Sequence, residues 1–356
     1  MENPFRFGTI VEGEYFTDRQ EELAEIKQKL ASPNHLTIIS PRRFGKSSLV
    51  LKAVKEMQRP YLMVNLQNVV SQEDLVNHLL RDFFRRHKWE KAKHLMSHFR
   101  FIPTVSVNPM TDGIDVAFNP TVNSNVVLED VFRLLENSAS PSERLIVVFD
   151  EFQDVLSLGK GLDRQLRAIM QQQQNINYIF LGSQESMMEE IFEKKKSPFY
   201  HFGALMRLHT IPQEEFNQYI IQRLKPIIGE QAEIISTEIL NITHCHPYYT
   251  QLLASQVWEL IQYQHITDNV VNKSIDKIIS IHDLDYERLW LNFNNTDRRI
   301  IKEICQGISP LTNRQQPSST NFSTIKRLMR KGYVIKNKNY QMEDPFFKEW
   351  VLTKRL

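Results

Sequence analysis

Short apolar runs alternate with longer amphipathic stretches along the first two thirds of the chain. The runs are too short for buried helices, and most are bounded by turn or polar residues, so they predict buried strands. The predicted strands are residues 36–39, 61–66, 145–149 and 178–181, with a fifth candidate at 205–211. The helical patterns between them are residues 47–57, 72–99, 128–136 and 162–171. This alternation is typical of an α/β fold, in which helices cover both faces of a parallel sheet.

Residues 100–123 interrupt this rhythm, because apolar and polar positions alternate there around Thr111-Asp112-Gly113. Such a pattern is a hairpin signal. We therefore expect a β-hairpin insertion that projects from a sheet domain of residues 1–211. The sequence does not say whether the hairpin covers a site or serves as a docking surface.

After Pro212 the pattern becomes helical, which predicts a helical lid over residues 212–284. Its expected helices are residues 214–225, 236–243, 247–264 and 270–282. A further unit is expected over residues 285–356. Helices at 296–306 and 323–331 are followed there by strands at 333–335 and 340–342 around a polar tip. This order is the outline of a winged helix, a helix-turn-helix variant.

The composition narrows the class of protein. With 356 residues and 41% apolar residues, the chain can bury sizeable cores, which excludes a disordered protein. Two cysteines, Cys245 and Cys305, cannot form a disulfide scaffold or a four-cysteine zinc site. No apolar run reaches the roughly 18 residues of a membrane helix, and the N-terminal residues lack a signal-peptide pattern. We expect a soluble, cytoplasmic protein with no membrane partner.

A candidate phosphate-binding loop follows the first predicted strand. Its sequence fits the pattern G-x-x-x-x-G-K-[ST] between a strand and a helix, except that Ser40 replaces the first glycine. Serine is small and can adopt the turn at modest cost. The alternative is an accidental match at a helix start. The candidate nucleotide-binding residues of this loop are Ser40, Pro41, Arg42, Arg43, Phe44, Gly45, Lys46, Ser47 and Ser48.

Each matching position of this loop has a chemical reason. Gly45 lets the backbone approach phosphates, and the helix that starts near Lys46 directs amide donors at them. We expect Lys46 to lie between the β- and γ-phosphates and to act in catalysis. The Ser47 hydroxyl is the expected Mg²⁺ ligand.

The strand at 145–149 ends in two carboxylates, Asp150 and Glu151. An apolar strand with this ending, placed after such a loop, has the form of a Walker B strand. Asp150 is the expected Mg²⁺ ligand through water, and Glu151 the residue that polarises the attacking water. Solvated edge charges are the alternative. After the next strand, Ser183 is the first candidate for a catalytic γ-phosphate sensor and Gln184 the second, with a simple turn as the alternative.

Together these motifs resemble the prokaryotic archaeal-type ATPases, P-loop proteins of the STAND branch related to AAA+ ATPases. Residues 5–23 are similar to the family's N-terminal motif, which places Phe16 and Arg19 by the adenine. The segment His246-Pro247-Tyr248-Tyr249 resembles the Gly-x-Pro motif, which assigns Pro247 to the nucleotide cover. Residues 343–350 resemble the close of the family's winged-helix domain. The resemblance implies ATP and Mg²⁺ as cofactors, and a nucleotide-dependent switch with slow hydrolysis.

Basic charge is concentrated at the C-terminal end of the chain. Residues 286–356 hold 14 Lys and Arg against 6 Asp and Glu, a net charge of +8, within a chain of net charge +2. A recognition helix with a basic wing would use such charges to contact duplex DNA. The candidate nucleic-acid contacts are Lys326, Arg327, Arg330, Lys331, Lys336 and Lys338. An acidic protein partner is the alternative.

Three functions are compatible with these observations. The first is an ATPase switch with a DNA-binding output, the second a DNA-binding regulator with a degenerate nucleotide site, and the third a nucleotide-gated protein adaptor. A GTPase is disfavoured because no Asn-Lys-x-Asp motif is present. A metal site at His244-Cys245-His246 is disfavoured because adjacent side chains cannot easily face one ion. Arg207 is a weak candidate for an arginine finger.

Overall fold

The computed structural model describes residues 2–17, 19–86, 104–108, 113–117, 124–311, 318–336 and 339–356. The chain divides into two compact units. The sheet unit contains Gln20–Ser40 and Leu49–Leu208. The helical unit contains Met1–Arg19, Pro41–Ser48 and His209–Leu356. The sequence predicted the sheet domain as one continuous stretch, whereas the N-terminal segment and the candidate phosphate loop cluster with the helical unit.

Five parallel strands form the main sheet in the order β2-β5-β6-β1-β7. They are β1 (Leu36–Ile39), β2 (Tyr61–Asn65), β5 (Leu145–Asp150), β6 (Ile176–Gly182) and β7 (Ala204–Arg207). Every residue of β1, β5 and β6 is buried, as expected for strands covered on both faces. The predicted parallel sheet is confirmed. The fifth strand is shorter than residues 205–211, because its pairing with β1 ends at Arg207.

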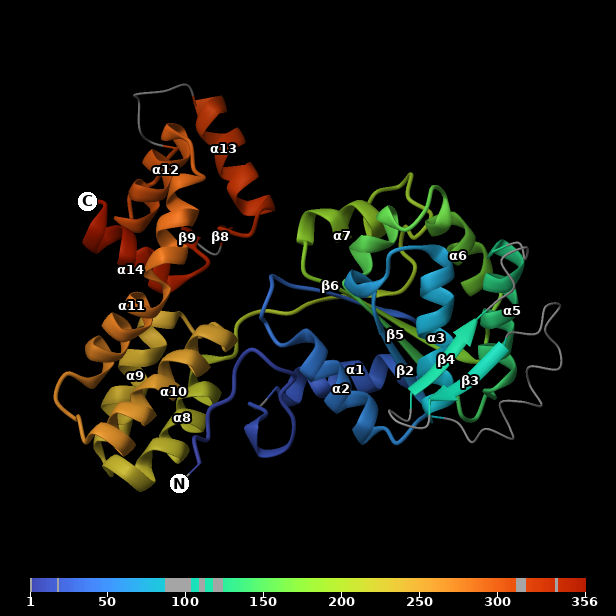
Figure 1. Cartoon of the computed structure of the whole chain (residues 1–356), viewed down its shortest axis with the longest axis horizontal. Helices are drawn as coiled ribbons and strands as arrows, with labels where there is room; N and C mark the ends of the chain where they lie inside the picture. Colours follow the sequence, from blue (N-terminus) through green and yellow to red (C-terminus); the bar gives the residue numbers. More distant parts are fainter. Residues whose placement is uncertain are drawn as a thin grey trace. The chain divides into compact units, whose positions relative to one another are not determined.

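Helices cover both faces of this sheet (Figure 1). They are α1 (Gln20–Ala31), α2 (Lys46–Glu56), α3 (Gln72–Arg86), α5 (Ser124–Asn137), α6 (Leu162–Met170) and α7 (Glu185–Phe192), with short 3₁₀ turns η2 (Leu66–Asn68) and η3 (Phe152–Ser157). The connection from β1 to β2 runs across the sheet in one direction, and those from β2 to β5, β6 and β7 run in the other. Right-handed crossovers therefore place α2 on one face and α5, α6 and α7 on the other.

Aromatic rings fill the core on the α6–α7 face of the sheet. The Phe180 ring of β6 lies 4.5 Å from Phe152, 5.2 Å from Phe192 and 5.6 Å from Phe199, measured between ring centroids. The rings of Phe149 and Phe180, which are register partners in β5 and β6, stack at 6.1 Å. Burying such rings is worth several kcal/mol each. Phe149 and Phe152 therefore fix the chain on either side of Asp150 and Glu151.

Two further strands of the sheet unit form a separate ribbon. Strands β3 (Thr104–Asn108) and β4 (Gly113–Ala117) pair antiparallel, with Thr104 opposite Ala117. They do not join the main sheet. The predicted insertion at 100–123 contains both strands, and its other residues lie outside the described part of the chain.

His35, which precedes β1, gives the sheet unit a predicted dependence on pH. Its ring centroid lies 4.4 Å from that of Phe202, and Nδ1 accepts a hydrogen bond from the Tyr178 amide at 3.2 Å. Burial, and then the positive charge of Arg167, lower the pKa of His35 to about 4. Because the unfolded chain takes up this proton near pH 6.5, the contribution to stability is present above that pH and is lost as pH falls toward 4.

We therefore expect the free energy of unfolding to fall by at most about 2 kcal/mol between pH 7 and 5 through this group alone. Replacing His35 by Gln should flatten the pH dependence by that amount in urea unfolding. His201→Gln, at an exposed site of the same unit, is the control that should keep the wild-type slope. Identical slopes for His35→Gln and the wild type would contradict the assignment.

The helical unit contains the predicted lid and the C-terminal region. Its elements are η1 (Gly13–Tyr15), α8 (Gln213–Ile228), α9 (Gln231–Thr243), α10 (Pro247–Gln264), α11 (Val270–Leu291), α12 (Asn295–Cys305), α13 (Ser318–Arg330), β8 (Val334–Lys336), β9 (Tyr340–Met342) and α14 (Pro345–Lys354). Helices α8 to α11 pack on one another (Figure 1). One continuous buried core runs from α8 to α14. The predicted boundary after residue 284 falls inside α11, because Tyr286 and Trp290 continue its buried face.

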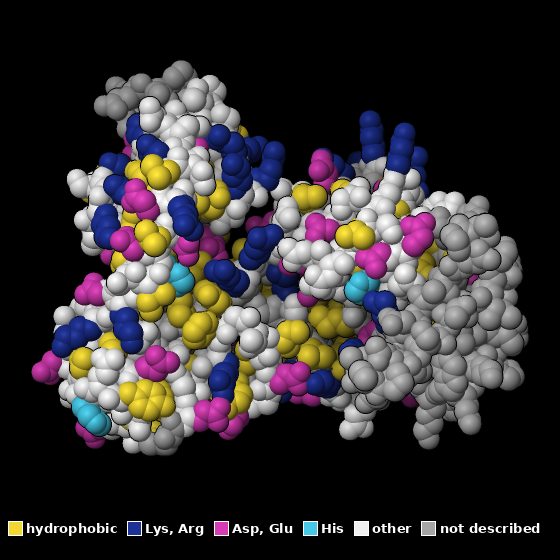
Figure 2. Space-filling model, viewed as in Figure 1, with side chains coloured by type: hydrophobic (Ala, Val, Ile, Leu, Met, Phe, Trp, Pro, Cys, Tyr) yellow, Lys and Arg dark blue, Asp and Glu magenta, His cyan; other side chains and the backbone are white. Residues whose placement is uncertain are grey.

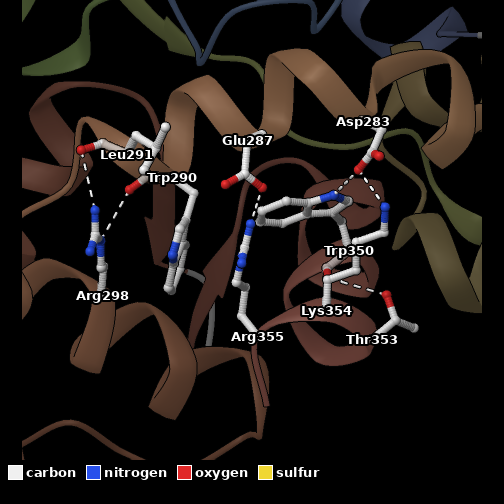
Figure 3. Close-up of polar contacts among 9 residues, drawn as sticks. All are labelled: Asp283, Glu287, Trp290, Leu291, Arg298, Trp350, Thr353, Lys354 and Arg355. Carbon is white, nitrogen blue, oxygen red and sulfur yellow. Dashed lines mark hydrogen bonds and ion pairs between the residues drawn. The ribbon is translucent and has the colours of Figure 1, made fainter.

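Polar contacts fix α14 against α11 (Figure 3). The Trp350 indole and the Lys354 ammonium both donate to Asp283 Oδ1 at 2.6 Å. One turn further along α11, Glu287 pairs with Arg355. Since these contacts bridge the two helices at both ends of a buried Trp350 ring, α14 has one defined position on α11.

The N-terminal segment runs along the lid helices of the same unit. Asn3 donates to the Ser255 hydroxyl of α10 at 2.8 Å, and the Tyr219 hydroxyl of α8 donates to the Tyr15 carbonyl at 3.1 Å. Phe5 is buried in the core of the unit. Across the described residues, the structure contains no helix with the length and apolar character that a membrane crossing requires.

Candidate functional site

The candidate phosphate loop, residues 40–48, has the backbone that its glycine requires. Gly45 has φ of +84°, in the region where only glycine is unstrained, and Arg43 has φ of +62°. Helix α2 starts immediately afterwards at Lys46. The first-turn amides of α2 therefore face the loop, which is the arrangement that favours phosphate oxygens.

Ser40, the departure from the expected glycine, is accommodated without strain. Its φ is not among the positive values found in the described residues. Ser40 is fully buried, and its amide donates to the Gly182 carbonyl of β6 at 3.3 Å. A side chain on ordinary backbone explains why serine can stand at this position.

The lysine of the loop folds back on its own backbone. Lys46 is 5% exposed, and its ammonium donates to the Pro41 carbonyl at 3.0 Å. The contact closes a ring around the loop. The charge of Lys46 is thus held against the backbone of the loop that is expected to bind phosphates.

Two other residues expected to touch the nucleotide, Ser48 and Arg19, make contacts that support the loop. The Ser48 hydroxyl accepts a hydrogen bond from the Val11 amide at 2.9 Å. The buried Arg19 guanidinium donates to the carbonyls of Phe44, at 3.2 Å, and His209, at 3.0 Å. These contacts tie the N-terminal segment to the loop. Phe16, Arg42 and Ser47 are half-buried or exposed.

The loop also contacts the first turn of α10. Arg43 lies over the Tyr248 ring, 4.4 Å from its centroid, and the Phe44 ring lies 4.7 Å from that of His246. Pro247 is the first residue of α10, where proline suits a helix start. His244 and Cys245 have φ of +51° and +58°, so both hold backbone that favours the small residue expected there.

At the acidic strand end, two donors hold the Glu151 carboxylate. Glu151 Oε2 accepts from the Ser183 hydroxyl and from the Gln153 amide, both at 2.6 Å. Glu151 itself has φ of +53° and ψ of +48°, a left-handed conformation that costs energy for a residue with a side chain. Its amide donates to Asp150 Oδ1 at 3.0 Å. The structure thus brings together Glu151 and Ser183, which the sequence proposed separately.

Gln153 is a site residue that the sequence analysis did not assign. It is 1% exposed, and its amide reaches the same carboxylate oxygen as Ser183. Its position two residues after Glu151 was the only available signal. Gln184, the second sensor candidate, is half-buried at the residue before α7, and its side chain does not cap that helix.

The strand order places these groups at one edge of the sheet. Strand β6 lies between β1 and β5, and all three are parallel. Their carboxyl ends carry Ser40, Asp150 and Ser183, of which each is at most 7% exposed. Ligands of open α/β sheets bind at the carboxyl ends of the strands. Just before Ser183, Gly182 leaves room for the Met188 side chain of α7, because a Cβ there would lie 2.2 Å from it.

The basic candidates of the C-terminal region are exposed on α13 and β8. Figure 2 shows Lys and Arg side chains over the region of α12 and α13. Lys326, Arg327, Arg330, Lys331 and Lys336 are exposed, and Arg327 also pairs with Asp297 of α12. Lys338 lies outside the described residues.

The two minor candidates gain no geometric support. Among the described residues, no group of His, Cys, Asp and Glu side chains is arranged to hold a metal ion, the His244–His246 segment included. Arg207 pairs within the sheet unit with Glu189, at 3.1 Å, and Glu193, at 2.6 Å. Both carboxylates belong to the α7 region, so they account for the charge of Arg207.

Comparisons with known proteins identify the family and the fold. The family described as an ATPase domain predominantly from Archaea matches residues 16–249. No curated protein sequence matches the chain. The Walker-type ATPase PABY2304 of Pyrococcus abyssi has a similar structure, with a TM-score of 0.69 and 16% identity over 97% of this chain and 99% of that one.

Two further solved structures are also similar. The ORC2 protein of Aeropyrum pernix, solved as ADPNP–ADP complexes, gives a TM-score of 0.59 and 13% identity over 99% of both chains. The ORC1 protein of the same organism, solved in complex with DNA, gives 0.50 and 12% over 99% of this chain and 98% of that one. Identities this low establish the fold alone. They confirm the predicted P-loop NTPase fold class.

Proposed function

The chain belongs to the family of ATPase domains found predominantly in Archaea, and from this premise we propose that it is a cytoplasmic, Mg²⁺-dependent ATP hydrolase that works as a nucleotide-driven switch. The observation that carries the proposal is the Glu151 carboxylate, held by Ser183 and Gln153 at the sheet edge where β1 leads into the phosphate loop. Backbone strain of the kind found at Glu151 is concentrated at functional sites, where the surrounding structure maintains it.

The residues present fit an ATP·Mg²⁺ complex. The concave loop around Lys46 suits the β- and γ-phosphates, and Gly45 leaves no side chain in their way. Ser47 and Asp150, a hydroxyl and a carboxylate, are the oxygen donors that Mg²⁺ prefers. The ion would neutralise charge on the phosphate oxygens.

In this proposal Glu151 is the general base. A carboxylate that polarises the attacking water needs a fixed orientation. The two hydrogen bonds to Glu151 Oε2 supply that orientation and leave the other carboxylate oxygen for the water. Ser183 then has a second role. Because its hydroxyl follows β6, which pairs with the strand that leads into the loop, we assign it the role of reporting whether the γ-phosphate is present.

The helical unit is the proposed output of the switch. The phosphate loop contacts α10, so a ligand on the loop acts on the lid directly. The single core from α8 to α14 would carry that change to the C-terminal region. We place the chain in the STAND branch and expect slow hydrolysis, since a switch needs a long-lived bound state.

We assign a winged helix to the C-terminal region and duplex DNA to its basic face. In support, α12 and α13 are followed by the antiparallel β8–β9 hairpin, which matches the order of such a domain. The similar ORC1 structure contains DNA. The exposed Lys326, Arg330, Lys331 and Lys336 supply the charge that phosphate contacts require.

Steady-state ATP turnover by the full chain with Mg²⁺, with and without duplex DNA, tests the proposal. We expect slow, Mg²⁺-dependent turnover that DNA alters. Turnover that ignores DNA would leave the ATPase and favour an acidic protein partner instead. An absence of both ATP binding and turnover would favour a DNA-binding regulator with a degenerate nucleotide site.

Replacing Lys326, Arg330 and Lys331 by Gln should weaken duplex DNA binding by about 10-fold or more at constant salt. The slope of log affinity against log salt concentration should become shallower by about one for each phosphate that the variant no longer neutralises. Fluorescence anisotropy over a salt series measures both. Unchanged affinity and slope would contradict DNA binding by α13.

A matched control removes the same charge elsewhere. Lys194, Lys195 and Lys196 are consecutive exposed residues of the sheet unit. Their replacement by Gln changes the net charge as much as the α13 variant does. If DNA binds to α13, this control variant should have the wild-type salt slope.

A further inference from the structure

A buried histidine lies between the phosphate loop and the C-terminal region, within the helical unit. His246 is 3% exposed and caps the start of α10. On one side its ring meets Phe44 of the loop edge-on, at 4.7 Å between centroids. On the other side its Nε2 lies 3.3 Å from Oε1 of Glu343, the second residue before α14. None of the roles proposed above uses this imidazole.

The hydrogen bonds of His246 define which nitrogen faces Glu343. Nδ1 accepts from the Tyr248 amide at 3.2 Å, so in the neutral ring the proton is on Nε2. Nε2 faces the Glu343 carboxylate, but the two groups are not aligned for a hydrogen bond. The other carboxylate oxygen, Oε2, accepts from the Tyr249 hydroxyl at 2.7 Å. Glu343 therefore contacts the start of α10 at two side chains, His246 and Tyr249.

The C-terminal region holds Glu343 in place. The Glu343 amide donates to the Tyr333 carbonyl at 3.0 Å. Its neighbour Asp344 caps α14 by accepting from the Phe346 and Phe347 amides, and also accepts from the Tyr286 hydroxyl of α11 at 3.1 Å. Since α14 is also fixed on α11 through Trp350 (Figure 3), the carboxylate has a defined position.

A polar pair at this place is not explained by packing alone. Around this pair lie aromatic rings, with Tyr249 4.5 Å from His246 and 5.9 Å from Phe346 between ring centroids, and two further charged groups. These are Asp344 and the Arg43 guanidinium of the loop, which interacts with Tyr249 and Glu343. Apolar side chains of similar volume would fill the space without the cost of desolvating a carboxylate and an imidazole. Buried polar pairs instead specify one arrangement of the elements that carry them.

We infer that His246 is a positioning residue for the phosphate loop, and that Glu343 makes its position depend on the C-terminal region. Phe44 transmits the position of the imidazole to the loop backbone, beside Gly45 and Lys46. The inference rests on the proposed function, because it concerns affinity for ATP at that loop. Coupling of this kind is reciprocal, so ATP on the loop would in turn bias the contact with Glu343.

Variants at both ends of the pair test the inference. Glu343→Gln keeps the size of the side chain and its bond from Tyr249 but removes the charge, and His246→Gln removes the ring that meets Phe44. We expect each to raise both Kd and KM for ATP by about 5- to 50-fold and to change kcat less than about 2-fold. The double variant should have a Kd for ATP no higher than that of the more weakly binding single variant, because the two substitutions break the same linkage.

Glu349→Gln is the matched control. It makes the same substitution in α14, at a half-exposed carboxylate that contacts Lys348, and should keep the wild-type Kd. Glu343→Asp, which keeps the charge, should restore part of the affinity. Thermal unfolding without nucleotide shows whether each variant is folded. If His246→Gln is unfolded, Phe44→Leu breaks the same linkage from the loop side, with the same expected rise in KM.

The outcomes separate this inference from the proposed function. A folded Glu343→Gln variant with wild-type Kd and KM would overturn the inference. So would an equal loss of affinity in Glu349→Gln, because the effect would then be unrelated to His246. A wild-type chain that binds no ATP would overturn the proposed function itself.

Discussion

Replacing Lys46 by Ala is expected to weaken binding of ATP by at least about 100-fold and to reduce turnover to background. Lys46 is 5% exposed, and its ammonium lies 3.0 Å from the Pro41 carbonyl of the loop. A phosphate in the loop would pair with this charge. Without Lys46, the phosphates would keep the amide donors and the proposed Mg²⁺ but lose this cation, and isothermal calorimetry with ATP measures the change.

Lys55→Ala is the control for this experiment. Lys55 is an exposed residue in the last turn of the same helix, α2. Its replacement changes the net charge equally and should leave Kd unaltered. A second variant, Lys46→Met, keeps the aliphatic part of the side chain, so a loss of affinity there cannot be assigned to a cavity. Wild-type affinity in a folded Lys46→Met variant would show that the loop does not bind the phosphates.

Replacing Glu151 by Gln is expected to lower kcat by about 100- to 10,000-fold while Kd for ATP stays near the wild-type value. The amide keeps the size of the side chain and an oxygen that accepts from Ser183 and Gln153 at their 2.6 Å positions. It cannot take a proton from water. Single-turnover hydrolysis, together with equilibrium binding, separates the two effects.

The control for Glu151 is Glu129→Gln, an exposed carboxylate on α5 of the same unit. It should keep wild-type turnover. If Glu151→Gln hydrolyses ATP normally, Glu151 is not the general base, and its contacts with Ser183 and Gln153 are structural. If instead both binding and turnover are lost, its role lies in holding the nucleotide.

The sequence predicted most of the sheet unit because its signals are local. Strands at 36–39 and 61–66 match β1 and β2 within one residue, since each is a short apolar run with polar boundaries. Helices α1, α7 and α14 were not predicted. Their apolar side chains are buried by partners elsewhere in the chain, as with Trp350 of α14 against α11. Likewise α11 continues to Leu291, because tertiary burial of Trp290 extends it.

For the candidate site, too, the sequence predicted the motif residues but not their backbone conformation. Lys46, Ser47, Asp150 and Glu151 could be found from the sequence because each belongs to a contiguous motif whose chemistry fixes the order of residues. Backbone conformation was not available at that level. The ordinary backbone of Ser40 and the left-handed one of Glu151 are consequences of strand pairing and of the buried rings on either side of Glu151.

By itself, then, the sequence determined the fold class, the phosphate loop and the acidic strand end, because hydrophobic periodicity and short motifs act over neighbouring residues. Only the tertiary structure decided which side chains contact the same carboxylate or the same ring. Gln153 and Ser183 meet on Glu151, and His246 meets Glu343 across 97 residues of sequence. Such contacts depend on how whole elements pack, and no local pattern encodes that packing.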